Sequence, residues 1–286
     1  MKKHSTHTAM LTAIFAITTS SVPPSSSAQT PTNKPFVVFN SLHYQDTPDL
    51  TKDGLHNIRL IYENKLTTAP IFGIGERSFN ASAITAAASL SKNEPDTPVS
   101  MDIESWRLNS GGDKKYIDSI RTFRKASPHS KIGLYGFIPF ANKLLYQSIV
   151  TNNPKLRSRW NSMQTQAKPV AEAVDIFMPS LYTWGKNIDA WKSTVKISIQ
   201  QARSTNPNKP IYAYIWPQYY NNNQPYALQF IDARTWRIEL DTLYQLVDGV
   251  IIWSSDKDAD GKPIKFSKSM PWYVATVSFM KKHDIH

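Results

Sequence analysis

Two carboxylic acids separated by one residue are the part of this sequence best suited to catalysis. Asp102 and Glu104 end an apolar run that begins at Val99. Residues two apart on a β-strand point to the same face, so both carboxyl groups should share one face. Their repulsion raises the proton affinity of at least one of them, and a carboxyl that keeps a proton near neutral pH can act as a general acid. The pair therefore predicts acid–base catalysis, with a structural ion pair to Arg107 as the alternative.

Aromatic residues gather at the ends of similar apolar runs. Tyr and Trp offer flat apolar faces with a polar edge, which suits the packing of sugar rings. The chain contains eight Trp and thirteen Tyr, but most aromatic residues in any protein belong to the core, so a single one carries little weight. Together they predict a carbohydrate-binding cleft, and those at or just past a run are Tyr135, Tyr182, Trp184, Tyr219, Tyr220 and Trp253.

These residues need a scaffold that brings separate strand ends together. Short apolar runs alternate along the chain with longer helical patterns, which is typical of a parallel α/β fold. The predicted strands are Phe36–Asn40, Ile58–Tyr62, Val99–Glu104, Lys131–Phe137, Ile176–Leu181, Ile211–Trp216 and Gly249–Trp253. The predicted helices are Asp113–Ala126, Pro154–Val174, Ile188–Ser204, Tyr226–Val247 and Met270–His283. The series predicts a parallel (β/α) barrel, seven-stranded or incomplete, with its active site at the carboxyl ends of the strands.

The N-terminal residues have the pattern of a secretory signal peptide. A short basic region with two lysines precedes an apolar stretch from Ala9 to Ile17, and small residues lead to Ala28. The stretch is too short to span a bilayer, so residues 1–28 are predicted to be a cleaved signal peptide of a secreted or periplasmic protein. Residues 29–34 are interpreted as a polar linker, and residues 35–286 as a single catalytic barrel domain.

Charge and composition restrict the partners. A formal net charge of +11 attracts polyanions, which include nucleic acid, anionic membrane surfaces and acidic polysaccharides. The basic residues are spread along the chain without a dense cluster, which argues against nucleic-acid binding, and no other segment is a candidate membrane span. The chain has no cysteine, so its core must stabilise it without disulfides. An acidic polysaccharide is the expected partner, and solubility alone is the other explanation of the charge.

No motif indicates a cofactor or a metal ion. The sequence lacks a phosphate-binding glycine loop, a nucleophile elbow and the spacing of zinc ligands. Asp256 to Gly261 resembles the start of a calcium loop, but Ser267 stands where a bidentate Glu is expected, and no helical pattern precedes it. A solvated turn is the favoured interpretation, and catalysis is expected to need neither a cofactor nor a metal.

Taken in order, the strand-end segments resemble the hyaluronidase family of glycoside hydrolases. The stretch from Asp102 to Arg107 is similar to the family's catalytic Asp-x-Glu-x-Trp-Arg. The resemblance extends from about Pro35 to Ser255, and its other segments are Pro35–Asn40, Asn57–Tyr62 with Leu66 and Pro70, Tyr135–Phe137, Pro179–Tyr182, Tyr214 with Tyr219, and Gly249–Trp253.

The resemblance implies a retaining, substrate-assisted mechanism, in which the N-acetyl oxygen of the substrate attacks the anomeric carbon. It implies that Glu104 protonates the leaving oxygen and later activates water, while Asp102 orients and stabilises the acetamido group. It also implies that Tyr182 and Tyr219 contact the reacting sugar and that Trp253 packs on the acetamido methyl. The expected substrate-binding residues are therefore Tyr182, Tyr219, Trp253, Tyr135 and Trp106.

Departures from the family leave the polysaccharide open between hyaluronan, chondroitin and a bacterial N-acetylated exopolysaccharide. The disulfides of the family are absent, and Leu108, Asn109 and a Gly-Gly pair occupy the loop after the catalytic Trp-Arg. A chitinase-like hydrolase is one alternative, although Thr97 and Ser100 occupy the upstream acidic positions of that family's Asp-x-x-Asp-x-Asp-x-Glu series. The other alternative is a non-catalytic carbohydrate-binding or adhesion protein on the same barrel, which would not need two repelling acids.

Overall fold

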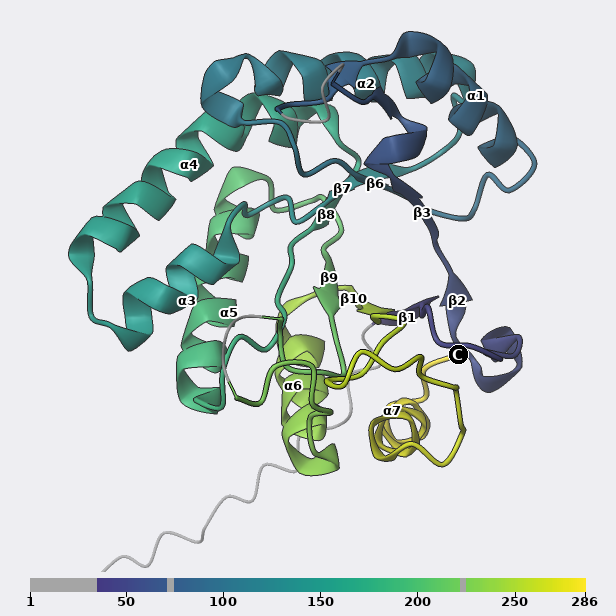
Figure 1. Ribbon diagram of the computed structural model, residues 1–286, viewed down its shortest axis with the longest axis vertical. Coiled ribbons are helices and arrows are strands. Elements are labelled where there is room, and N and C mark those ends of the chain that lie inside the picture. Colours follow the sequence, from purple (N-terminus) through teal and green to yellow (C-terminus); the bar gives the residue numbers. More distant parts are fainter. Residues whose placement is uncertain (1–34, 71–74, 222–224) are drawn as a thin grey trace, which may run out of the picture. The chain divides into compact units, whose positions relative to one another are not determined.

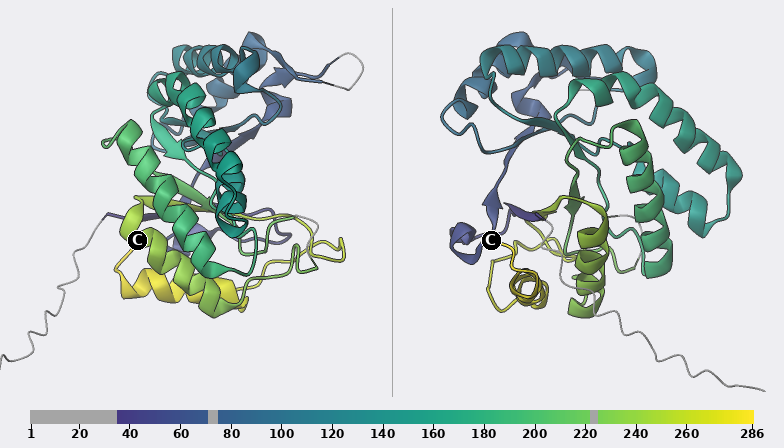
Figure 2. Two further views of the ribbon diagram at one scale, coloured as in Figure 1. Left: turned by 90° about the vertical axis from the view of Figure 1, so that its left-hand side faces the viewer. Right: turned by 180° about the vertical axis from the view of Figure 1, so that it is seen from behind.

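Parallel strands lie at the centre of the computed structural model, and helices lie around them (Figures 1 and 2). The structure describes residues 35–70, 75–221 and 225–286, all within a unit that spans Asn33–His286. The predicted signal peptide (residues 1–28) and the predicted linker (29–34) lie outside the described residues.

Each of the seven apolar runs of the sequence overlaps a strand, and the short β2 (His56–Asn57) lies just before the second run. The strands are β1 (Val37–Ser41), β2 and β3 (His56–Asn57 and Arg59–Tyr62), β6 (Val99–Asp102), β7 (Ile132–Tyr135), β8 (Ile176–Met178), β9 (Tyr212–Ile215) and β10 (Gly249–Trp253). One four-stranded parallel sheet has the order β2-β1-β10-β9, and a second has the order β3-β6-β7-β8. A separate antiparallel pair consists of β4 (Thr67–Thr68) and β5 (Ser78–Phe79).

The two parallel sheets continue into one another at both ends. Isolated parallel bridges join Phe177 to Ile211 and Ser180 to Tyr214, at β8 and β9. On the other side, Ile58 alone separates β2 from β3 along the chain. The strand order is therefore cyclic, as in a (β/α) barrel, although the hydrogen-bonded ladders do not close into a single sheet. The predicted parallel α/β class is confirmed. The two sheets contain eight parallel strands rather than seven, because His56–Asn57, just before the predicted run Ile58–Tyr62, forms a short strand of its own.

Helices follow the strands along the chain, and side-chain caps fix where several of them begin. Asn80, Asn153, Asn187 and Asp232 each precede a helix and accept a hydrogen bond from a backbone N–H of its first turn, which satisfies one of the otherwise unpaired donors there. The α-helices of the described residues are α1 (Ala81–Ser91), α2 (Gly112–Ala126), α3 (Asn142–Val150), α4 (Pro154–Ala173), α5 (Ile188–Thr205), α6 (Ala233–Leu246) and α7 (Pro271–Lys282). None of them is long and apolar enough to cross a bilayer.

The helices differ from the sequence-based expectation in three places. Helices α1 and α3 were not predicted, because α1 is rich in Ala and Ser without a distinct apolar stripe and α3 is short. The helix predicted over Tyr226–Val247 begins only at Ala233. The residues before it pair instead with the segment after β9: the Leu228 N–H donates to Tyr219 O at 3.0 Å, and the Tyr219 N–H donates to Gln229 O at 2.9 Å.

Much of the aromatic content belongs to the core rather than to a surface. Five of the largest fully buried side chains are Trp106, Trp160, Trp191, Trp236 and Trp272. Where an indole N–H is buried, it commonly finds an acceptor, as in the bonds of Trp191 to Leu181 O at 3.0 Å and of Trp236 to Thr276 Oγ1 at 2.8 Å. Three of the eight Trp residues, Trp184, Trp216 and Trp253, are absent from that group.

Gly249 permits β1 and β10 to approach each other closely, and its substitution should destabilise the fold. A methyl group at residue 249 would lie 2.5 Å from Val37 O, a rigid backbone atom, whereas a methyl group at Gly133 would meet the flexible side chain of Met178 at 2.6 Å. We expect Gly249→Ala to lower the free energy of unfolding by roughly 1–3 kcal/mol and Gly133→Ala to lower it less. Urea unfolding of both variants checks this, and a larger loss in Gly133→Ala would contradict it.

Candidate active site

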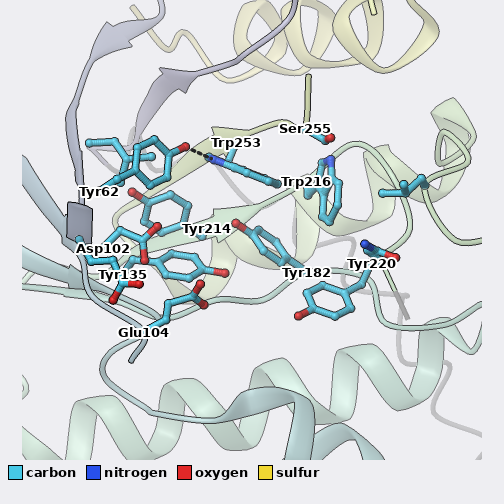
Figure 3. Close-up of a pocket in the computed structure, with 14 residues that line it drawn as sticks. Tyr62, Asp102, Glu104, Tyr135, Tyr182, Tyr214, Trp216, Tyr220, Trp253 and Ser255 are labelled. Atoms are coloured by element: carbon cyan, nitrogen blue, oxygen red, sulfur yellow. Dashed lines mark hydrogen bonds between the residues drawn. The ribbon is translucent and has the colours of Figure 1, made fainter. Parts of the chain in front are cut away.

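A cavity of about 450 Å³ lies at the carboxyl ends of the strands. The last residues of β3, β6, β7 and β10 contribute Tyr62, Asp102, Tyr135 and Trp253 to its lining. Figure 3 shows Asp102 and Glu104 on one side of this cavity and Trp216 with Tyr220 on the other; the rings of Tyr135, Tyr182 and Tyr214 lie between them. Residues distant in sequence therefore meet where the barrel arrangement predicts an active site.

The cavity brings together five of the seven residues that the sequence indicated. Asp102, Glu104, Tyr135, Tyr182 and Trp253 all line it. Their predicted roles in catalysis and binding remain proposals, but their convergence on one site agrees with the expectation from the strand ends.

Trp106 does not line the cavity, contrary to the prediction that it binds substrate. Its side chain is 2% exposed, and its indole N–H donates to Arg77 O at 2.6 Å. The ring packs edge-on against Tyr116 of α2, with the centroids 5.1 Å apart. Trp106 therefore packs between the segment after β6 and helix α2, and it stabilises that segment without lining the cavity.

Tyr219 is also absent from the lining, and its neighbour Tyr220 takes that place. The ring of Tyr219 packs against Tyr226 at 5.1 Å. The two residues lie on a segment paired on both sides, since the Tyr219 N–H donates to Gln229 O and the Tyr220 N–H donates to Thr183 O, both at 2.9 Å. Successive side chains of an extended segment point in opposite directions, which explains why only one of the two tyrosines reaches the cavity.

Sequence reasoning missed several residues of the lining. Glu63 directly follows the predicted strand Ile58–Tyr62. Its position as a carboxylate at a strand end could have identified it as a residue of the site. Its Oε2 accepts a hydrogen bond from the Ser105 N–H at 3.2 Å and so ties the end of β3 to the segment after β6. Three aromatic residues of the lining were also not indicated by their position at the strand ends: Tyr62, Tyr214 and Trp216.

Three carboxylates, Glu63, Asp102 and Glu104, are the charged groups among the described residues that line the main cavity. Burial raises the pKa of Asp102 to about 7, and the charges of Glu104 and Glu63 add to this effect. Enclosure by the cavity walls raises the pKa of Glu104 as well, again with a contribution from Glu63. No ion pair among the described residues includes any of the three. The alternative of a structural ion pair with Arg107 is therefore wrong.

The charge of the main cavity is opposite in sign to the net charge of the chain. An acidic polysaccharide as partner predicts basic residues in the cleft, but the charged residues that line the main cavity are Glu63, Asp102 and Glu104. A sugar that carries a carboxylate would meet like charges here. The main cavity therefore suits an uncharged sugar ring, whatever the charge of the rest of a polymer.

One oxygen of Asp102 lacks a partner. Oδ1 is buried and forms no hydrogen bond in the structure. A buried acceptor without a donor is unfavourable, and for an ionised carboxylate the penalty is larger. Asp102 therefore either keeps a proton or needs a donor from a bound molecule. Because Asp102 and Glu104 interact, the protons titrate from the pair rather than from one residue.

The opposite wall is a cluster of rings with polar edges. Tyr182 stacks on Trp253 with centroids 5.9 Å apart, and Trp216 packs edge-on against Trp253 at 4.9 Å. The Trp253 indole N–H donates to the Tyr62 hydroxyl at 3.2 Å, and that hydroxyl lies 2.7 Å from His43 Nε2. Since ring contacts and hydrogen bonds hold these side chains, the wall offers fixed aromatic faces to a ligand.

The described residues contain no group of three or more His, Cys, Asp and Glu side chains that could hold a metal ion. The segment from Asp256 to Gly261, which resembles part of a calcium loop, forms a turn. Asp258 Oδ1 accepts hydrogen bonds from the backbone N–H groups of Asp260 at 2.9 Å and Lys262 at 2.8 Å. This carboxylate therefore stabilises the turn itself.

Comparison with known proteins supports the fold. No protein-family model matches the sequence, and no curated protein matches it. Among solved structures, bee venom hyaluronidase matches with a TM-score of 0.57 and 13% identity, over 87% of this chain and 97% of that chain. The same bee protein in complex with a hyaluronic acid tetramer matches with a TM-score of 0.54 and 14% identity, over 87% and 96%. The chain thus has the barrel fold of this glycoside hydrolase, and at such identity the likeness concerns the fold alone.

The buried carboxyl of Asp102 should weaken the fold as the pH rises. Its pKa is about 7 in the folded protein and 3.8 ordinarily, so the folded state binds more protons and loses stability as pH rises from about 4 through 7. Asn carries no titrating proton, so Asp102→Asn should stabilise the protein at pH 8, by an amount on the order of a few kcal/mol, and leave it unchanged near pH 3.

Urea unfolding at pH 3, 6 and 8 measures this difference. Asp189→Asn is the matched control, because the Asp189 side chain is 90% exposed and the substitution should not increase stability at any pH. Equal stability of Asp102→Asn and the wild-type protein at pH 8 would show that the Asp102 carboxyl is not destabilised by burial.

Proposed function

We propose that the protein is a glycoside hydrolase of the hyaluronidase type, which cleaves an N-acetylated polysaccharide by a retaining, substrate-assisted mechanism. The observation that carries this proposal is the buried, unpartnered Oδ1 of Asp102 beside Glu104, in a cavity walled by aromatic rings. An acetamido N–H is a donor that would satisfy this oxygen, and the ring faces suit a sugar.

Binding of the acetamido group at Asp102 would also favour the protonated form of Glu104. A hydrogen bond to the ionised form of a carboxyl lowers its pKa. When the substrate N–H donates to Asp102, the proton shared by the pair therefore moves toward Glu104. Glu104 is the more exposed of the two and lines the cavity, so it is suited to meet the glycosidic oxygen. The substrate itself thereby sets Asp102 as the anion and Glu104 as the proton donor.

The placement of the pair favours the substrate as the nucleophile. Asp102 and Glu104 lie next to each other at the end of one strand, whereas two carboxylates that act directly on a glycosidic bond flank it from opposite sides. In the first step, the acetamido oxygen bonds to the anomeric carbon, the bond to the leaving oxygen breaks, and Glu104 gives its proton to that oxygen. In the second step, water bonds to the anomeric carbon, the acetamido oxygen departs, and Glu104 takes a proton from the water.

Two further observations support this proposal. Bee venom hyaluronidase has the same fold and is known in complex with a hyaluronic acid tetramer, so this fold is compatible with a polysaccharide ligand. The predicted signal peptide over residues 1–28 would bring the enzyme to extracellular or periplasmic polysaccharide. We propose export on that basis.

Replacement of the acid tests the catalytic assignment. Glu104→Gln keeps the shape of the protonated acid but cannot transfer its proton, so turnover should fall by about 10²–10⁴-fold while polysaccharide binding persists. New reducing ends would be measured on hyaluronan, chondroitin, a partially acetylated bacterial exopolysaccharide and chitin oligosaccharides. Glu172→Gln, at an exposed residue of α4, is the control. A near-wild-type rate in Glu104→Gln would sink the assignment, and binding without turnover by the wild-type protein would favour a carbohydrate-binding protein.

Fluorination of the substrate tests the nucleophile. Fluorine atoms on the acetyl group withdraw electrons from its oxygen, so the rate should decrease stepwise from N-acetyl to N-fluoroacetyl, N-difluoroacetyl and N-trifluoroacetyl aryl glycosides. The initial rate of aryl alcohol release measures this series. Rates that do not depend on fluorination would exclude attack by the acetamido oxygen in the step that limits turnover.

A further inference from the structure

Two smaller cavities continue the main cavity on the side of Glu104. The second cavity, of about 200 Å³, shares Glu104, Tyr135 and Tyr220 with the main one. A third cavity, of about 240 Å³, shares Lys143 and Trp184 with the second. The three cavities therefore adjoin one another in a series that leads away from Asp102, which lines the main cavity alone, and this series is called the groove below.

The position of the proton donor indicates which cavities would bind the reacting sugar and which would bind the leaving part of the substrate. A general acid protonates the leaving oxygen and therefore lies between the reacting sugar and the leaving sugar. Glu104 lines both the main and the second cavity, whereas the acetamido group is expected beside Asp102 in the main one. The second and third cavities thus lie where the leaving part of the chain would extend.

We propose that these two cavities bind the leaving part of the polysaccharide and that Lys143 binds an anionic group on the first leaving sugar, as in a polymer that alternates N-acetylated and carboxylate-bearing sugars. This inference rests on the proposed function, because it uses Glu104 as the proton donor. It makes Lys143 the residue that selects for acidic substrates.

The surroundings of Lys143 leave its charge available to a ligand. The residue belongs to the first turn of α3 and is half-buried, and its Nζ lies 4.6 Å from the ring centroid of Tyr220. A cation above an aromatic face is held in place without being neutralised. No ion pair within the described ranges includes Lys143, whereas Lys115, for example, pairs with Glu76 at 2.8 Å.

Charge changes sign along the groove. The charged residues of the main cavity are three acids, those of the second cavity are Glu104 and Lys143, and the third cavity has Lys143 as its charged residue. Lys186 adds to this trend, because its Nζ lies 5.1 Å from the ring centroid of Tyr226 in the third cavity. An uncharged sugar at the reaction centre followed by an acidic sugar matches this order, whereas an all-neutral polymer would leave Lys143 without a partner.

The test compares substrates that carry the carboxylate on different sides of the cleaved bond. The first is a hyaluronan hexasaccharide, whose leaving part contains a uronate. The second is an aryl glycoside of a hyaluronan oligosaccharide that ends in N-acetylglucosamine, so its uronates lie only on the reacting side and its leaving group is neutral. The third is chitohexaose, which carries no charge. The variants are Lys143→Met and, as control, Lys155→Met on α4, an exposed residue outside all three cavities.

We expect Lys143→Met to lower kcat/KM on the hexasaccharide by about tenfold or more, since it removes a charge-assisted hydrogen bond, and to make the rate less sensitive to salt. It should change kcat/KM on the aryl glycoside and on chitohexaose less than about twofold, within the effect of Lys155→Met on a surface charge. A loss on the hexasaccharide alone supports the proposal, because a damaged fold would slow all three substrates.

The outcomes distinguish a failure of the proposed glycosidase function from a failure of the proposed role of Lys143. If wild-type protein cleaves none of the substrates, the proposed function is wrong and this inference falls with it. If it cleaves neutral substrates but not the hexasaccharide, or if Lys143→Met and Lys155→Met behave alike on the hexasaccharide, the glycosidase stands and the role of Lys143 is overturned. An equal loss in Lys143→Met on the aryl glycoside would also overturn it.

Discussion

The placement of Asp102 and Glu104 in one cavity, with no ion pair to either acid within the described ranges, is the constraint on which the site depends. Parallel pairing of β3 with β6 sets Tyr62 opposite Asp102, which brings Glu63 toward the same end of the barrel. Burial and like charge then raise the pKa of Asp102 to about 7. A cation paired with these carboxyl groups would lower their pKa values, and the proposed acid would then not keep its proton near neutral pH. The free energy that is lost by burying the Asp102 carboxyl is offset by the core around it, as is common at functional sites.

Hydrogen bonds from the surrounding layers hold both walls of the cavity. On the acidic side, the Tyr116 hydroxyl of α2 donates to Ile103 O at 2.7 Å, next to the carboxylate pair. On the aromatic side, the Thr183 hydroxyl donates to the fully buried Glu239 of α6 at 2.6 Å, and burial raises the pKa of Glu239 to about 8. Thr183 follows Tyr182 and accepts the Tyr220 N–H. Helices outside the barrel thus hold the segments that carry the site residues, which is the preorganisation that the proposed catalysis would require.

The strands and the acid pair were predictable from sequence, because both depend on local patterns. A parallel strand covered on both faces is a short apolar run, and the spacing of Asp102 and Glu104 is a property of one such run. The choice of Tyr220 over Tyr219 was not predictable, because it depends on the pairing of that segment with Leu228 and Gln229. A shift of one residue reverses which side chains face the cavity. Glu63 and the burial of Trp106 were missed for a related reason, since each depends on contacts between elements distant in sequence.

The net charge of this protein and the charge of its main cavity act over different distances. A formal charge of +11 describes the long-range field, which draws a polyanion toward the molecule and weakens as salt increases. The lining of the main cavity is acidic and acts over the few ångströms at which a sugar is selected. The two are compatible when the polymer carries its charge on alternate sugars. In the proposed binding mode, the field would attract the whole polymer, the acidic cavity would exclude the charged sugar from the reaction centre, and Lys143 would favour that sugar one position away. In this way the register of the substrate would be set by electrostatics as well as by the aromatic walls.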